Sequence, residues 1–226
     1  MMESLDRDNF SKVVDIEYFL GRSLEEKEKR KSTPEKLHVR GPLQIPIPRP
    51  AVSIVGSRKA SPQGIENAKR IAKELVKQGV VIISGLAEGI DTAAHQSAID
   101  NGGKTIAVLG TPLSKVYPQK NRWLQEEIMR NHLAISQFPE GHITFPKDFV
   151  ARNMTMALIS DATIIVEATE TSGSRHQGWE TIRLRKPLFI WESILRNPKS
   201  DLYKEMLNYD VTRELSDPSQ VMEFLN

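Results

Sequence analysis

Short apolar runs alternate with longer amphipathic stretches through the middle of the chain. The apolar runs have the length and β-branched composition of buried strands, and they predict strands at 52–55, 80–83, 105–109, 133–136, 163–166 and 188–191. The stretches between them have helical periodicity, and they predict helices at about 62–78, 91–102, around 124–129, at 149–160 and within 172–185. This alternation predicts an α/β fold with a doubly wound, mostly parallel sheet.

Both ends of the chain depart from this rhythm. Residues 1–36 predict an N-terminal appendage: one short helix or strand, then a mixed-charge run from Arg22 to Lys36 that is interpreted as a solvated helix or linker. We expect the main domain to span 37–191, and to open with a small edge strand at 37–41. Residues 192–226 predict a C-terminal tail of one or two short amphipathic helices.

Composition removes several classes of function. The 31 Lys and Arg residues nearly balance 29 Asp and Glu residues, so the net charge of +2 gives no general signature of nucleic-acid binding. The absence of cysteine excludes disulfides, thiolate metal sites and cysteine nucleophiles. The first 20 residues lack the apolar core of a signal peptide, and no apolar run is long enough to span a bilayer. We therefore expect a soluble, cytoplasmic protein with no membrane partner.

The loop after the first predicted strand has the features of an anion site. Gly56 permits a sharp turn, and Ser61 is a good N-cap residue for the helix that follows. The backbone N–H groups of such a turn point outward at the positive end of the helix dipole. Ser57, Arg58 and Lys59 lie in the same turn. The alternative is an ordinary loop with two solvated cations.

Other polar clusters also follow predicted strands, and the carboxyl ends of parallel strands meet at one sheet edge, where ligands of such folds bind. Ser84 and Gly85 follow the second strand, the segment from Lys115 to Arg122 follows the third, and Ser172 to Ser174 follow the fifth. We expect these loops to line one polar crevice.

No catalytic or metal site is predicted. The first turn lacks the G-x-G-x-x-G pattern and the chain lacks a Walker sequence, which weakens a dinucleotide or P-loop interpretation. The serines of these loops have no evident histidine and acid partners. The histidines share no helix face with paired carboxylates. We expect no catalytic residue, no metal and no cofactor.

Several motifs, taken in order, resemble the DNA-processing protein A (DprA, or Smf) family. They are Gly56 to Ser61, Ser84 to His95, Gly102 to Gly110, Tyr117-Pro118 with Asn121, Phe149 to Asn153, Ser160-Asp161 and Ser172 to Ser174. The resemblance extends from about Leu37 to Trp191. It implies a Rossmann-like domain that binds single-stranded DNA, forms dimers, and delivers the strand to a recombinase during natural transformation. It implies no enzymatic turnover.

The resemblance also implies which residues contact DNA. Arg58 matches an arginine of the family that contacts DNA, and Arg152 and either Lys120 or Arg122 match basic positions of the same groove. With the neighbouring loop residues, the expected DNA or phosphate contacts are Gly56, Ser57, Arg58, Lys59, Ser84, Gly85, Lys120, Arg122, Arg152, Asn153, Ser172, Gly173 and Ser174. The chain departs from the family at Met154, where a basic residue is usual, and after Ser174.

Two alternatives to a DNA-binding module remain open. The segment Ser172 to Glu180 loosely resembles the sites of nucleotide-binding or nucleotide-hydrolysing sensors in the same broad superfamily, with Arg175 and Glu180 as its charged residues. The second alternative is a scaffold protein whose appendages bind a partner. If the chain binds DNA, we expect the DNA bases to stack on Tyr117, Phe145 or Trp179.

A homodimer is expected on two grounds. The family resemblance implies one. The last predicted strand also carries Leu188, Ile190 and Trp191, which we expect to leave apolar surface exposed near the tail.

Overall fold

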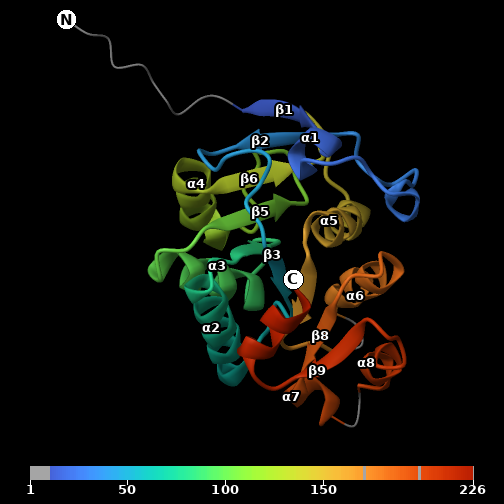
Figure 1. Ribbon diagram of the computed structural model, residues 1–226. Helices are drawn as coiled ribbons and strands as arrows, with labels where there is room; N and C mark the ends of the chain where they lie inside the picture. Colours follow the sequence, from blue (N-terminus) through green and yellow to red (C-terminus); the bar gives the residue numbers. More distant parts are fainter. Residues whose placement is uncertain (1–10, 170–171, 198–199, 226) are drawn as a thin grey trace, which may run out of the picture.

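The computed structural model describes residues 11–169, 172–197 and 200–225; the first ten residues of the predicted appendage, residues 170–171 and 198–199 and the last residue of the tail lie outside this range (Figure 1). Within it, nine strands form one sheet in the order β1-β2-β6-β5-β4-β3-β7-β8-β9. The strands are β1 (Lys12–Asp15), β2 (Lys36–Arg40), β3 (Ala51–Val55), β4 (Val81–Ser84), β5 (Thr105–Leu109), β6 (Leu133–Ser136), β7 (Ala162–Ile165), β8 (Leu188–Trp191) and β9 (Thr212–Leu215). Pairing is parallel from β6 to β9, and antiparallel at β1 and β2.

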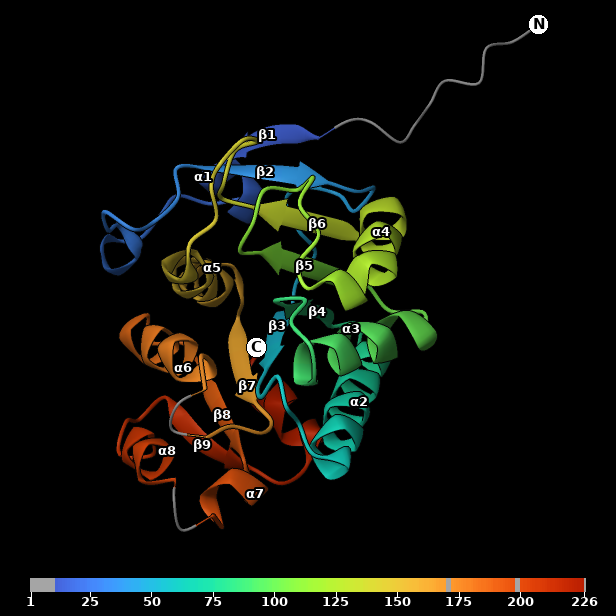
Figure 2. The same ribbon diagram turned by 180° about the vertical axis from the view of Figure 1, so that it is seen from behind.

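Helices cover both faces of the sheet, with α2, α3 and α4 on one side and α5, α6 and α8 on the other (Figures 1 and 2). The helical elements are α1 (Ile16–Leu20), η1 (Glu26–Glu28), α2 (Pro62–Lys77), α3 (Ile90–Asp100), η2 (Gln119–Asn121), α4 (Arg122–Asn131), α5 (Pro146–Ile159), α6 (Ser174–Arg183), α7 (Glu192–Leu195), α8 (Asp201–Met206) and η3 (Pro218–Phe224). The predicted doubly wound, mostly parallel α/β fold is confirmed.

The central strands are buried on both faces, as their continuous apolar runs predict. Every residue of β3, β4, β5 and β7 is buried. The chain passes from β3 to β4 on one side, and returns later to place β7 on the other side of β3. The connections that leave β3 and β7 therefore run in opposite directions, and doubly wound sheets open a crevice for ligands at the carboxyl ends of such neighbouring strands.

Two predictions about sheet edges are wrong. The strand predicted at 37–41 is β2, which lies between β1 and β6 and not at an edge. The N-terminal appendage supplies β1, which pairs with β2 and covers its outer edge. At the other end, Leu188, Ile190 and Trp191 are buried instead of forming an apolar surface, because β9 pairs with β8.

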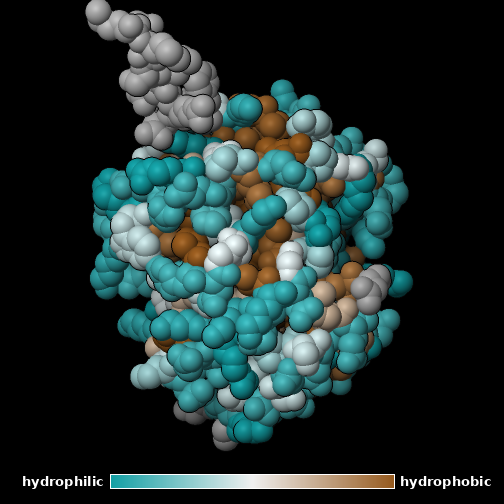
Figure 3. All heavy atoms as spheres, turned by 60° about the vertical axis from the view of Figure 1, so that its left-hand side comes forward, coloured by the Kyte–Doolittle hydropathy of each residue, from teal (hydrophilic) through white to brown (hydrophobic). Residues whose placement is uncertain are grey.

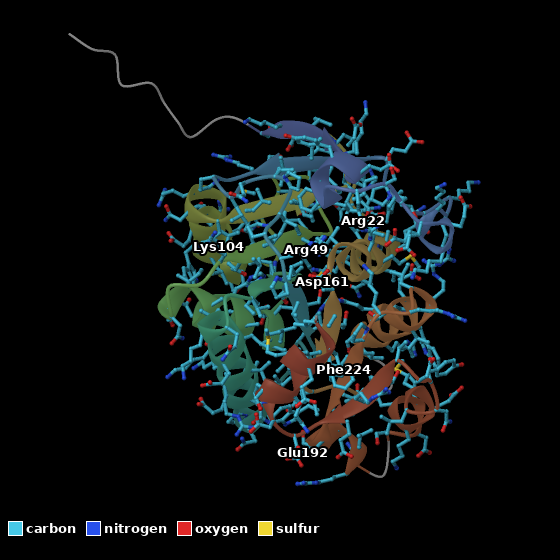
Figure 4. All side chains as sticks on the ribbon, viewed as in Figure 1. Arg22, Arg49, Lys104, Asp161, Glu192 and Phe224 are labelled. Carbon is cyan, nitrogen blue, oxygen red and sulfur yellow. The ribbon has the colours of Figure 1, made fainter. Side chains whose placement is uncertain are left out.

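The strand β9 was missed because the predicted helical tail gives no strand signal there. Only the first and last residues of its sequence, Thr212 and Leu215, are buried, while Arg213 and Glu214 between them are exposed. The tail also returns across the sheet: the ring of Phe224, labelled in Figure 4, meets that of Phe189 edge-on with centroids 5.6 Å apart. The tail is thus a mixture of short helices and one strand that completes the sheet.

The mixed-charge run from Arg22 to Lys36 is mostly exposed, as expected of a solvated segment, but one of its acids is buried and anchors it. Glu28, in η1, has only 1% of its surface exposed, and its carboxylate pairs with the Arg22 guanidinium at 2.6 Å. The Nζ atom of Lys186 lies 4.0 Å from the same carboxylate and donates to carbonyls at the end of α5. Ion pairs between distant segments therefore fix this run to the body.

The amino ends of two central strands are joined by another ion pair, which is marked by its two labels in Figure 4. The Arg49 guanidinium lies 2.9 Å from the Asp161 carboxylate, which also accepts a hydrogen bond from the Ala51 backbone N–H. These contacts tie the amino ends of β3 and β7 together.

The surface over α2, α3 and α4 is mostly hydrophilic, with scattered hydrophobic areas (Figure 3). No helix within the described residues combines the length and the apolar composition that crossing a membrane requires.

A buried histidine should make stability depend on pH. His95, in α3, is fully buried with Nδ1 2.7 Å from Thr105 Oγ1, and burial lowers its pKa from 6.5 to about 3. Below pH 6.5 the unfolded chain takes up a proton that the folded chain does not. The free energy of unfolding should therefore fall with decreasing pH, by up to about 1.4 kcal/mol per unit between these two pKa values.

Chemical denaturation of the wild type and of His95→Gln at about pH 7, 6 and 5 tests this. Glutamine keeps a hydrogen-bonding group for Thr105 but does not titrate, so the variant should lose less stability over the same range. Equal losses in the two proteins would show that His95 does not set the acid limit of the fold.

Candidate functional site

A hollow at the carboxyl edge of the sheet lies where β3 and β7 meet. It has a volume of about 540 Å³ and is enclosed by the loops after β3 and β7, together with residues of α3, α5 and α6. Of the residues predicted from the sequence, its lining includes Gly56, Ser57, Arg58, Lys59, Arg152, Asn153, Ser172, Gly173 and Ser174. The structure thus brings together loops that are more than 100 residues apart in the chain.

A second hollow of about 230 Å³ adjoins the first. The two share Arg58, Lys59, Ala87 and Arg152, so these residues form the boundary between them. Gly85, Tyr117 and Phe149 are among the other residues that line the smaller pocket, which is more apolar in character than the larger one. The result is one polar and one aromatic compartment, side by side, with cations between them.

Arg58 is the exposed cation of this boundary. Its guanidinium carbon lies 5.7 Å from the centre of the Phe149 ring, and that ring is 5.2 Å from the ring of Tyr117. A guanidinium above an aromatic face is held by attraction to the ring quadrupole. Arg58 is therefore oriented toward both pockets, and its N–H groups face solvent.

Arg152 is the buried cation, with only 4% of its surface exposed. Its Nη1 donates to the carbonyls of Gly85 and, at 3.0 Å, Val108, so one side chain from α5 joins the ends of β4 and β5. A Cβ atom on Gly85 would overlap this guanidinium, so a larger residue there would have to displace Arg152. Burial lowers the pKa of Arg152 to about 10, so the group stays charged at neutral pH.

Asp91 is the buried acid that faces Arg152. Its carboxylate accepts hydrogen bonds from the backbone N–H groups of Gly85 at 3.1 Å and Ala87 at 3.3 Å. Burial raises the pKa of Asp91, while the positive charge of Arg152 and these two donors favour the ionised form. Arg152 thus carries out a structural task in addition to lining the pockets.

The helix expected to provide the anion site, α2, does not provide it. The Glu167 carboxylate accepts from the Ser61 backbone N–H at 2.8 Å and from the Ser61 hydroxyl, so an acid already occupies that positive end. The first turn of α6 lies against the larger pocket instead, and its N-cap residue, Gly173, has no side chain to cap it.

Three predicted residues lie outside both pockets. Ser84 is fully buried and donates to the Ile54 carbonyl at 2.6 Å, which joins β4 to β3. Lys120 and Arg122 are exposed on η2 and at the start of α4. Lys120 Nζ lies 3.1 Å from the carboxylate of Glu88, a lining residue of the smaller pocket, so it reaches the rim.

The nucleotide site considered for Ser172 to Glu180 is not formed as expected. The Glu180 carboxylate pairs with Arg30 at 3.0 Å and Arg183 at 2.5 Å, and it faces the N-terminal segment instead of the large pocket. Trp179, expected as a stacking residue, packs edge-on against Tyr209 with ring centres 5.5 Å apart. Phe145 is exposed at the start of α5 and lines neither pocket.

Phe149, Asp91 and Gln177 line the pockets but were not singled out as site residues. Asp91 and Phe149 belong to the motifs Ser84 to His95 and Phe149 to Asn153. The amphipathic pattern of a helix, however, does not distinguish a side chain that faces the core from one that faces a pocket. Among the residues described, no three His, Asp or Glu side chains are grouped closely enough to hold a metal ion.

Comparison with known proteins places these features in a family. The chain is 43% identical over 141 residues to the DNA processing protein DprA of Streptococcus pneumoniae, a match covering 62% of this chain and 49% of that protein. The X-ray structure of DprA from the same species superposes with a TM-score of 0.79 and 29% identity, over 97% of this chain and 76% of that one.

A second solved structure is that of DNA processing protein A from Helicobacter pylori, described for its single-stranded DNA binding mode. It superposes with a TM-score of 0.75 and 28% identity, over 89% of this chain and 92% of that one. The family model of DNA recombination-mediator protein A matches residues 22–226, so it includes both the docked charged run and the strand in the tail. The chain therefore belongs to the DNA recombination-mediator protein A family, also known as DprA or Smf.

Proposed function

We propose that this protein binds single-stranded DNA at the two adjoining pockets. The observation that carries the proposal is the arrangement at their boundary, where the exposed guanidinium of Arg58 lies beside the rings of Phe149 and Tyr117. Proteins that bind single strands combine cations for the phosphates with aromatic faces for the bases. The Helicobacter pylori relative, described as binding single-stranded DNA, supports this assignment.

The two compartments suit the two parts of a nucleotide. Arg58 and Lys59 offer positive charge to phosphate in the larger pocket, and the start of α6 offers the positive end of its dipole, which no side chain of Gly173 caps. Tyr117 and Phe149 offer ring surface to a base in the smaller pocket. Phosphate contacts and stacking are both tolerant of sequence, so the site should bind most single strands.

The wider role follows the family. We propose that the protein acts in DNA processing by binding and not by catalysis, in the cytoplasm, and that it delivers the strand to a recombinase during DNA uptake and natural transformation. The family's description as a recombination mediator supports this. We also propose a homodimer, although the apolar strand that suggested one is covered by β9. A light-scattering mass equal to one chain at micromolar concentration would exclude it.

Arg58→Ala should weaken binding of fluorescent oligo-dT without changing the fold, because Arg58 is exposed. Loss of one phosphate contact should reduce the slope of log affinity against log salt by roughly 0.7. Arg58→Lys should restore only part of the affinity, since an ammonium group cannot form the planar fork of a guanidinium. Anisotropy titrations at several salt concentrations measure both quantities.

Arg130→Ala is the matched control, because Arg130 is exposed at the far end of α4. It removes the same charge, and the slope should stay near that of the wild type. If the two variants bind oligo-dT equally well, the turn after β3 is not the DNA site.

Arg152→Met should lower the free energy of unfolding. It leaves Asp91 buried without its counter-charge and removes the link between β4 and β5, a change that typically costs about 3–5 kcal/mol. Arg58→Ala should change the free energy of unfolding by no more than about 0.5 kcal/mol. Urea denaturation of both variants measures the contrast, and equal stabilities would contradict the structural role given to Arg152.

A further inference from the structure

Trp123 is a large aromatic residue whose side chain is exposed and does not contribute to the core. It is the second residue of α4, and 52% of its surface is accessible, while Leu124 and Ile128 of the same helix are buried. The other two tryptophans are packed: Trp191 is buried beneath the Arg70 guanidinium, and Trp179 packs against Tyr209. Tryptophan is usually well buried in folded proteins, so an exposed ring on a helix is available for a ligand.

The segment from Tyr117 to Trp123 has an exposed aromatic residue at each end and two exposed basic residues between them. Tyr117 is 46% exposed and lines the smaller pocket. Lys120 and Arg122 are exposed between Tyr117 and Trp123. Interleaved rings and cations on one short segment are typical of a surface for single-stranded nucleic acid.

This segment is held firmly at the carboxyl edge of the sheet. The Asn121 side chain is buried, and its Nδ2 donates to the Leu86 carbonyl at 2.9 Å and to Thr92 Oγ1 at 2.8 Å. The contact between Lys120 and Glu88 joins the same turn to the rim of the smaller pocket. The surface is therefore preorganised and continuous with the pocket through Tyr117.

We propose that Tyr117, Lys120, Arg122 and Trp123 form a second subsite for the same DNA strand as it leaves the smaller pocket. This rests on the function proposed above. One base stacks on the Trp123 indole, and the adjacent phosphates lie against Lys120 and Arg122. The occupant is single-stranded DNA because the positive charge complements phosphate and because the surface continues the proposed site. Lys120 pairs with Glu88 at 3.1 Å and Arg122 with Glu126 at 3.8 Å, so phosphate must displace these exposed carboxylates, while the buried Asn121 contacts keep the turn in place.

Intrinsic fluorescence tests the proposal directly, because Trp123 is the exposed indole among the three. Oligo-dT of about twelve nucleotides should quench the emission of the wild type, and an oligomer of about four, which fits the pocket alone, should quench it much less. In Trp123→Phe the quenching should be lost while affinity is largely kept, since phenylalanine still presents a ring.

Trp123→Ala should weaken binding of the longer oligomer by roughly 5- to 150-fold, which corresponds to about 1–3 kcal/mol for one stacked base, and should leave binding of the shorter one unchanged. Tyr209→Ala, which removes an exposed aromatic residue far along the chain in the tail, is the control and should bind both as the wild type does. Alanine is a good helix former, so the fold of α4 should survive.

The outcomes separate this inference from the proposed function. If Arg58→Ala weakens binding but Trp123→Ala binds both oligomers like the wild type, the pocket binds DNA and the second subsite is wrong. If the wild type binds neither oligomer, both proposals fall. Quenching by the longer oligomer that persists in Trp123→Phe would also overturn the subsite, since it would come from Trp179 or Trp191.

Discussion

A buried arginine holds together the edge of the sheet on which the candidate site depends. Arg152 projects from α5 and is buried. Its guanidinium donates to the carbonyls at the ends of β4 and β5 and faces the buried Asp91. A buried charge is tolerated only when partners surround it. These partners include backbone groups of the loops that line both pockets. The Arg152 charge therefore stabilises the loops and also fixes the distance between the ends of β4 and β5.

The same charge gives the site its electrostatic character. Arg152 stays protonated at neutral pH despite burial, and Arg58 adds a second, exposed positive charge a short way along the pocket wall. Acids elsewhere are committed to other partners: Glu167 closes the end of α2, and Glu180 pairs with two arginines. Arg58 is therefore an exposed cation on this wall, while Arg152 is buried and bonded to backbone carbonyls.

Much of the fold was predictable because local patterns agree with it. Continuous apolar runs in the central strands and amphipathic helices between them are local signals, and the placement of Arg58 and Ser172 at strand ends follows from topology. The errors share one cause, which is tertiary pairing between distant segments. The approach of Lys186 to Glu28, the capping by Glu167 and the addition of β9 depend on partners that no local pattern identifies.

The most direct test of the account is to map where a bound strand lies. Oligo-dT carrying photoreactive halogenated uracil can be crosslinked to the protein, and the attached peptides identified by mass spectrometry. The account predicts crosslinks at Tyr117 and Phe149, the rings that line the smaller pocket. Crosslinks confined to Trp179 and Tyr209, which pack against each other in another part of the fold, would contradict it.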